Sequence, residues 1–135
     1  MTRLGPAALA LTLLAGAASA QETLRTYDAA GRLTGRQESR DGTTRVYDPA
    51  GRSIGRAETR GGTTRFYDPA GRSTGRAEGS RFHDPSSRST GRAETRGGTT
   101  RYYDEDGRGT GRAETRGDTT RFYDPAGRRT GEARR

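Results

Sequence analysis

The sequence predicts an all-β protein made of six repeated β-hairpins in one antiparallel layer, arranged as a single-layer meander or an open β-coil. A segment close to TTRFYDPAGRSTGRAE occurs six times, at intervals of 20 residues with one interval of 16. A period of this size is typical of repeat architectures. Within each copy, β-branched and aromatic residues precede a cluster of turn-forming residues, which is the pattern of a strand and its hairpin turn.

Residues 1–20 have the features of a cleaved signal peptide, which we expect to form a helix before its removal. They contain a basic Arg3, an apolar run over residues 4–18 and Ala-Ser-Ala before Gln21. This run is shorter than the roughly 20 residues of a transmembrane helix, and no later segment is as apolar. We therefore expect one six-unit repeat domain, residues 21–135, that is periplasmic or secreted and has no transmembrane segment after signal cleavage.

The first strand of a unit, for example residues 63–67, ends in the turn sequence Asp-Pro-Ala-Gly. Asp can bond the backbone ahead of it, Pro fixes φ, and Gly accepts a left-handed conformation, so we expect a type I turn with a glycine bulge. The second strand of this unit is residues 72–78, and in the neighbouring units the equivalent strand leads to a tight turn such as Gly61-Gly62. The predicted structural turn residues are Asp28, Gly31, Asp48, Gly51, Asp68, Gly71, Asp104, Gly107, Asp124 and Gly127.

The period of two along a strand places Arg65 and Tyr67 on one face and Phe66 on the other. Asp68 should lie opposite Arg72, and the same pair recurs in other units as a cross-strand ion pair.

The same register sets Tyr67 beside Ser73 and Arg65 beside Gly75. The unit starting at residue 63 lacks the Thr-Arg-Gly-Gly that ends its neighbours, so we expect a lost turn and a tight, bulged or broken step there.

Composition limits the core and the partners. The 21 glycines and few large apolar residues argue against a two-layer core and leave a disordered exported repeat protein as an alternative. All 25 basic residues are arginine, against 17 acidic ones, and the net charge of +8 becomes +7 without the signal peptide. An exported chain of this charge will meet anionic surfaces. The simpler interpretation is that alternating charges keep a solvated sheet soluble.

Catalytic and metal-binding patterns are absent from the sequence. There is no cysteine, and His83 stands where other units have Tyr, so we interpret it as an aromatic substitute. The acidic loop at Asp104 lacks the further oxygen ligands that calcium requires. We expect no enzyme activity and no cofactor. A hydrolase built on the repeat is the least favoured function, and export removes the chain from nucleic acid.

Residues 27–34 (YDAAGRLT) and their equivalents, which begin at residues 47, 67, 103 and 123, resemble the YD repeat of the Rhs family. The resemblance covers nearly all of residues 21–135. It implies β-hairpin strips that coil into a shell, on exported or surface proteins that contact carbohydrate or enclose a toxin. Six units are too few for such a shell, so we do not expect encapsulation.

These observations predict a non-enzymatic module that acts as a scaffold or interaction surface in the bacterial envelope. The alternative is an arginine-rich binder of anionic envelope glycan or lipopolysaccharide, through a ladder with a spacing of roughly 10 Å. Its candidate residues are Arg45, Arg65, Arg101 and Arg121. The competing interpretation is that these arginines pair with Glu58, Glu78, Glu94 and Glu114 across strands. Another envelope protein, or a second copy joined through sheet edges, is a further partner to consider.

Overall fold

The structure is a computed structural model that describes residues 21–135. The predicted signal peptide, residues 1–20, lies outside the described residues. Among the residues described, no helix is long and apolar enough to cross a membrane.

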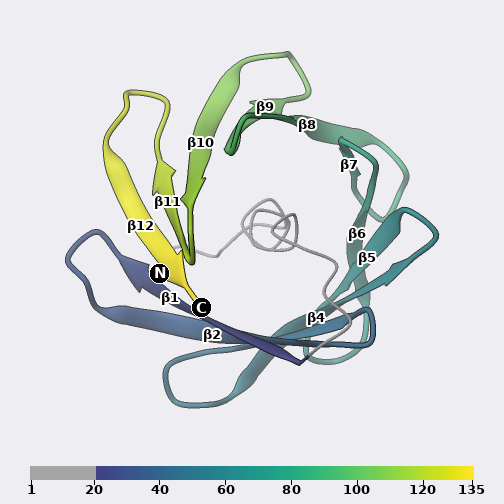
Figure 1. Ribbon diagram of the computed structural model, residues 1–135. Helices are drawn as coiled ribbons and strands as arrows, with labels where there is room; N and C mark the ends of the chain where they lie inside the picture. Colours follow the sequence, from purple (N-terminus) through teal and green to yellow (C-terminus); the bar gives the residue numbers. More distant parts are fainter. Residues whose placement is uncertain (1–20) are drawn as a thin grey trace.

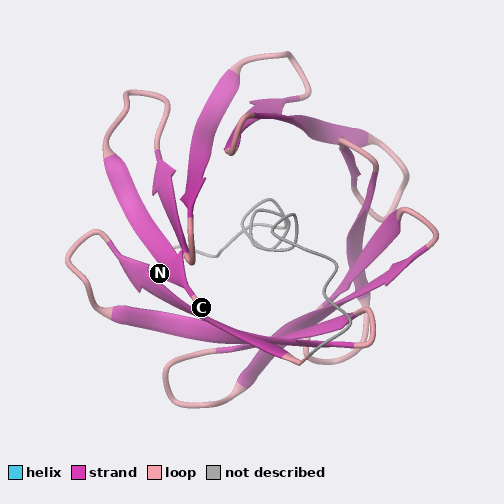
Figure 2. Ribbon diagram, viewed as in Figure 1, coloured by secondary structure: helices cyan, strands magenta, loops and turns pink. Residues whose placement is uncertain are grey.

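The described chain consists of antiparallel strands joined by short turns, and Figure 2 shows no helix in it. The expected all-β architecture of repeated hairpins is therefore confirmed. The strands are β1 (Glu22–Asp28), β2 (Leu33–Arg40), β3 (Thr43–Tyr47), β4 (Ser53–Arg60), β5 (Thr63–Tyr67), β6 (Ser73–Glu78), β7 (Arg81–His83), β8 (Ser89–Arg96), β9 (Thr99–Asp104), β10 (Gly109–Arg116), β11 (Thr119–Tyr123) and β12 (Arg129–Arg134).

The meander closes into a barrel, because β12 pairs with β1 (Figure 1). We call this pairing the seam. Arg134 lies opposite Arg25 and Ala133 opposite Thr26, the same register that joins β4 to β5 within a hairpin. The sheet is therefore closed and is not the open coil that was one of the two expectations. Closure follows because the twist of successive strands adds up until the first and last strands meet. Closure also leaves no free sheet edge among the described strands.

The predicted Asp-Pro-Ala-Gly turns form with their glycine bulges. The Gly71 N–H donates to the Asp68 carbonyl over 3.0 Å, and Gly71 has a φ of 86°. The Arg72 N–H donates to Asp68 Oδ1 over 2.9 Å, and this bond to the carboxylate recurs in every unit. The repeated side-chain ion pair is less regular. Within the described chain it forms at Arg72–Asp68, 3.5 Å, and at Arg128–Asp124, 3.1 Å, whereas Asp28 and Asp48 show only the backbone bond.

Hydrogen bonds in one of these turns make the structure sensitive to acid. The Arg128 backbone N–H, followed by the charge and side chain of Arg128, lowers the pKa of the Asp124 carboxyl. A lowered pKa adds stability above the unfolded-state pKa, and that stability disappears as pH falls through the folded-state value. Asp124→Asn should therefore be less stable than wild type at pH 7, with the difference closing below about pH 4. Urea unfolding at pH 7 and pH 3 measures this difference.

The matched control is Asp118→Asn, since the Asp118 side chain makes no hydrogen bond or ion pair among the described residues. A difference between wild type and Asp124→Asn that is equal at both pH values would contradict the prediction.

A bulge in each second strand changes the expected register. Tyr67 lies opposite Ser73, as predicted, but Phe66 and not Arg65 faces Gly75, because Thr74 is an extra residue between the two pairs. A Cβ on Gly75 would lie 2.5 Å from the His83 carbonyl oxygen, and the φ of Gly75 is 148°. Glycine is required here because the backbone of the neighbouring strand lies too close to leave room for a side chain.

The short unit keeps its turn, so the expectation of a lost turn is wrong. Gly79 and Ser80 form the turn, with a φ of 55° at Gly79, and Glu78 faces Arg81 across it. The two strands are each shorter by two residues. Hydrogen-bonded and non-hydrogen-bonded residue pairs alternate along an antiparallel ladder, and a two-residue turn follows only one of these types. A hairpin that keeps this turn is therefore shortened by two residue pairs at a time. Ala77 consequently still faces Phe82, and the pairing continues unbroken.

The apolar residues line the inside of the barrel, because alternate residues of a barrel strand point to opposite faces. Phe66 is 2% exposed and packs with Ala57, Ala77 and Phe82. Phe82 also packs against the cluster around Tyr102, so it connects the two apolar clusters. In four units the large residue faces an alanine on the neighbouring strand. In the other two, Val46 faces Gln37, and Thr26 faces Ala133.

Candidate functional site: rows of arginine, glutamate and tyrosine on the outer face

The outer face carries a polar pattern that the strand register repeats. On β4 and β5, Glu58 lies opposite Arg65 and Arg56 lies opposite Tyr67. Arg65 in turn lies opposite Arg76 on β6. Read across adjacent strands, four outward residues therefore follow the order glutamate, arginine, arginine, aromatic residue.

We call such a set a row, and distinguish its first arginine, next to the glutamate, from its second, next to the aromatic residue. Four rows follow this order: Glu38–Arg45–Arg56–Tyr67, Glu58–Arg65–Arg76–His83, Glu78–Arg81–Arg92–Tyr103 and Glu94–Arg101–Arg112–Tyr123.

The second arginine of a row is held by two partners. The Arg56 guanidinium carbon lies 4.5 Å from the centre of the Tyr67 ring, and Arg56 Nε lies 3.2 Å from Glu58 Oε1 on its own strand. Arg36, Arg92 and Arg112 are held in the same way by a tyrosine and a glutamate. Stacking on an exposed ring contributes about 0.5–1 kcal/mol, which restricts the side chain to one orientation.

The first arginine is left without a counterion. Arg65 is exposed, and no carboxylate of the described chain lies within 4.0 Å of its guanidinium. Its cross-strand neighbour Glu58 is paired with Arg56 instead. The hydrogen bond from Arg76 is the largest cause that lowers the pKa of Glu78, and the charge of Arg65 is the smallest. The glutamates therefore form their ion pairs with the second arginines and not with the first.

A like charge lies on the other side of each first arginine in these four rows. Arg65 faces Arg76 and Arg45 faces Arg56. Like charges directly opposite each other destabilise a sheet. The outer face therefore keeps exposed guanidinium groups beside like charges, which is unfavourable for the sheet.

Three of the four arginines predicted as a ladder, Arg45, Arg65 and Arg101, occupy this first position. Arg121 differs, because it lies between Glu114 and Glu132. The competing interpretation was that these arginines pair with glutamates across strands. A glutamate does lie opposite each of the four arginines, but in the described chain none of the four forms an ion pair within 4.0 Å.

Two further arginines at this position were missed by the sequence analysis. Arg25 and Arg81 are also exposed and also stand three residues before the turn aspartate. The fixed distance to Asp28 and Asp84 could have identified them. The signal was obscured because the Thr-Thr that precedes the other arginines is replaced by Thr-Leu and Gly-Ser.

The seam reverses the charges of the repeat. On β12, Glu132 takes the place of an arginine and Arg134 the place of a glutamate. Glu132 is 3% exposed, lies 2.5 Å from Arg129 and also pairs with Arg134. The two rows at the seam therefore read Glu114–Arg121–Glu132–Tyr27 and Arg134–Arg25–Arg36–Tyr47.

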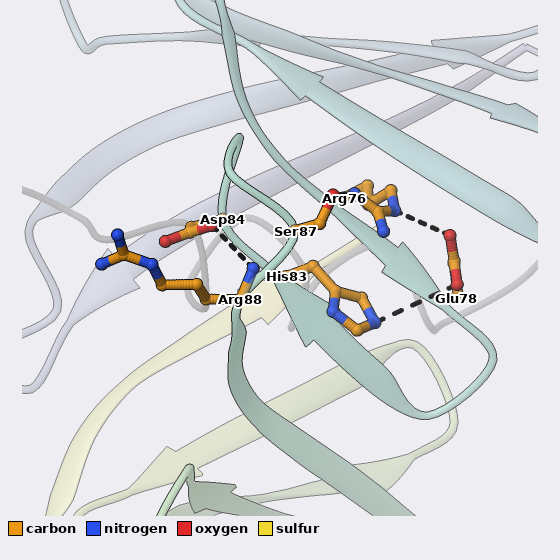
Figure 3. Close-up of polar contacts among 6 residues, drawn as sticks. All are labelled: Arg76, Glu78, His83, Asp84, Ser87 and Arg88. Carbon is orange, nitrogen blue, oxygen red and sulfur yellow. Dashed lines mark hydrogen bonds and ion pairs between the residues drawn. The ribbon is translucent and has the colours of Figure 1, made fainter.

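In the row that contains His83 the second arginine has altered partners, and Figure 3 shows this arginine, Arg76, with Glu78, His83 and Ser87. Arg76 Nε lies 2.7 Å from Glu78, and Arg76 Nη1 donates to Ser87 Oγ over 3.0 Å. Ser87 replaces the turn glycine at a φ of 69°, and its hydroxyl accepts a bond that glycine could not. His83 Nε2 lies 4.0 Å from Glu78. Among the described residues, no three His, Cys, Asp or Glu side chains group to hold a metal.

The fold and the rows define a class of protein: a closed barrel of β-hairpin repeats with exposed arginines on its outer face. No family model, curated protein or solved structure matches the chain.

Proposed function

We propose that the chain is a non-enzymatic binding module that holds an anionic polymer against the outer face of its barrel. The observation that carries this proposal is the first arginine of the four ordinary rows. It is exposed, has no carboxylate within 4.0 Å in the described chain, and faces a second arginine.

Spacing favours a polymer over a small ligand. First arginines occur on every second strand, and strands lie about 4.8 Å apart, so consecutive members are separated by roughly 10 Å. A guanidinium binds phosphate or carboxylate through two parallel hydrogen bonds. One such exposed contact is weak, but several contacts along one chain act together.

The expected signal peptide points to an envelope polymer. The polymer class that we propose is an anionic glycan or a phosphorylated lipopolysaccharide, met in the periplasm or outside the cell. The resemblance to the YD repeat supports the same class, because that family implies contact with carbohydrate. The broader alternative is a scaffold that uses this face to contact another envelope protein.

Binding should depend on where the arginines lie and not only on total charge. Changing Arg45, Arg65, Arg81 and Arg101 together to Gln should weaken binding to phosphorylated lipopolysaccharide at least tenfold, because several charge-assisted contacts of about 1 kcal/mol are lost. Equilibrium binding at low and at physiological salt measures this loss. Wild-type affinity should fall as salt rises, because screening acts over about 8 Å at physiological ionic strength.

The matched control removes four charges elsewhere, with Gln at the exposed turn-end positions Arg40, Arg60, Arg96 and Arg116. This variant has the same net charge as the first. Equal losses of affinity in the two variants would show that binding follows net charge alone, and would refute the proposed site.

A further inference from the structure

We propose that the seam row Arg134–Arg25–Arg36 is the principal anion site of the barrel and that it takes a phosphate group. This inference deepens the proposed function and rests on it. The three residues lie on β12, β1 and β2, which are adjacent in Figure 1.

The charge reversal on β12 creates this site. An ordinary row carries two arginines and one glutamate, whereas this row carries three arginines and no glutamate. The neighbouring seam row, which includes Glu132, has two glutamates and one arginine. The exchange therefore places a third arginine in this row, and that arginine, Arg134, pairs with Glu132 of the next row.

Arg25 is the centre of the site. It is exposed, has no ion pair among the described residues, and faces an arginine on both sides, Arg36 and Arg134. No other first arginine of a row lies between two arginines. The repulsion there is relieved most directly by an anion bound between the strands.

The flanking guanidinium groups are already oriented. Arg36 lies 4.5 Å from the Tyr47 ring centre and 3.0 Å from Glu38. Arg134 lies 5.5 Å from the Tyr27 ring centre and pairs with Glu132. Two fixed donors and one free donor form a site in which little side-chain freedom remains to be lost on binding.

The number of donors favours phosphate over carboxylate. A phosphate monoester carries nearly two charges and three strong acceptor oxygens, and a carboxylate carries one charge and two oxygens. Three guanidinium groups on adjacent strands offer enough hydrogen-bond donors for three oxygens. The phosphate group could be part of a glycan or be free inorganic phosphate, and these two sources share this chemistry.

Binding here would hold the barrel closed, because the ligand contacts both strands of the seam. A ligand that binds only the folded state raises stability with its concentration. We therefore expect sodium phosphate to raise the thermal midpoint by about 4 °C or more over sodium chloride of equal ionic strength.

Two single variants test the site. In chloride, Arg25→Gln should raise the midpoint, since it removes a charge flanked by two like charges, and it should lose the phosphate-specific rise. Arg121→Gln, at the matching position between two glutamates, should lower the midpoint in chloride and keep the phosphate-specific rise. A lower midpoint for Arg25→Gln in chloride, or an unchanged phosphate response, would overturn the site.

A binding measurement distinguishes failure of the seam site from failure of the proposed function. Arg25→Gln is compared with the variant altered at Arg45, Arg65, Arg81 and Arg101 for binding to phosphorylated and dephosphorylated lipopolysaccharide. If only the fourfold variant loses binding, the seam is not the principal site and the polymer-binding function stands. If Arg25→Gln loses the phosphate response and neither variant changes polymer binding, the seam takes free phosphate and the polymer-binding function fails.

Discussion

Replacing Gly75 by Ala is expected to destabilise the barrel by about 3 kcal/mol or more, through backbone strain and a clash that only backbone movement can relieve. Its φ of 148° is one that residues with a side chain rarely adopt, and the added Cβ would lie 2.5 Å from the His83 carbonyl oxygen. That oxygen belongs to the backbone of a paired strand, so it cannot move without disturbing the sheet. Urea unfolding followed by circular dichroism measures the loss.

Gly97→Ala provides the control for this substitution. Gly97 also has a positive φ, 59°, but nothing lies within 4 Å of a Cβ built there. Its replacement should cost only about 1 kcal/mol, the ordinary cost of a left-handed alanine. Similar losses for the two variants would show that the close approach at Gly75 is not required.

Phe66→Ala is expected to cost about 3–5 kcal/mol, the range for a buried aromatic side chain. Phe66 is 2% exposed and packs with Ala57, Ala77 and Phe82. The two alanines are too small to fill the space. Because small domains are stable by only about 5–15 kcal/mol, much of the stability would be lost with one side chain. The midpoint and slope of urea unfolding measure this effect.

Ile54→Ala removes an aliphatic side chain from an exposed position and is the matched control for Phe66→Ala. Ile54 is 38% exposed, so its truncation should cost under about 1 kcal/mol. A small loss for Phe66→Ala, comparable with that of Ile54→Ala, would show that the inside of the barrel does not hold the fold together.

Local chemistry made the turns and the two faces predictable. Asp68 and Gly71 determine a turn within four residues, and the alternation of Arg65, Phe66 and Tyr67 determines which side chains share a face. These features depend only on neighbours in the chain. The bulge at Thr74 was not predicted, because it is seen only once both strands are aligned. It makes Phe66, and not Arg65, the cross-strand partner of Gly75.

Closure and the seam could not be deduced in the same way. Whether β12 meets β1 depends on twist summed over every strand between them, and no single residue reports that sum. The reversed charges are visible in the sequence, where residues 131–134 read GEAR and residues 55–58 read GRAE. Their meaning required knowing that Arg134 lies beside Arg25. For the same reason the second glutamate beside Arg121, Glu132, was not foreseen.

The shared register of the seam and of an ordinary hairpin has a consequence for chain connectivity. Since β12 meets β1 as β4 meets β5, the ring is nearly indifferent to where the polypeptide starts. A circular permutant that joins Arg134 to Glu22 through a short turn and opens at Gly61 would keep every strand neighbour. New ends are best tolerated at such exposed turns. Glu132 and Arg134 would then lie within a continuous hairpin. The new terminal strands would be β5 and β4, which carry the ordinary repeat sequence, and their pairing would have to close the barrel.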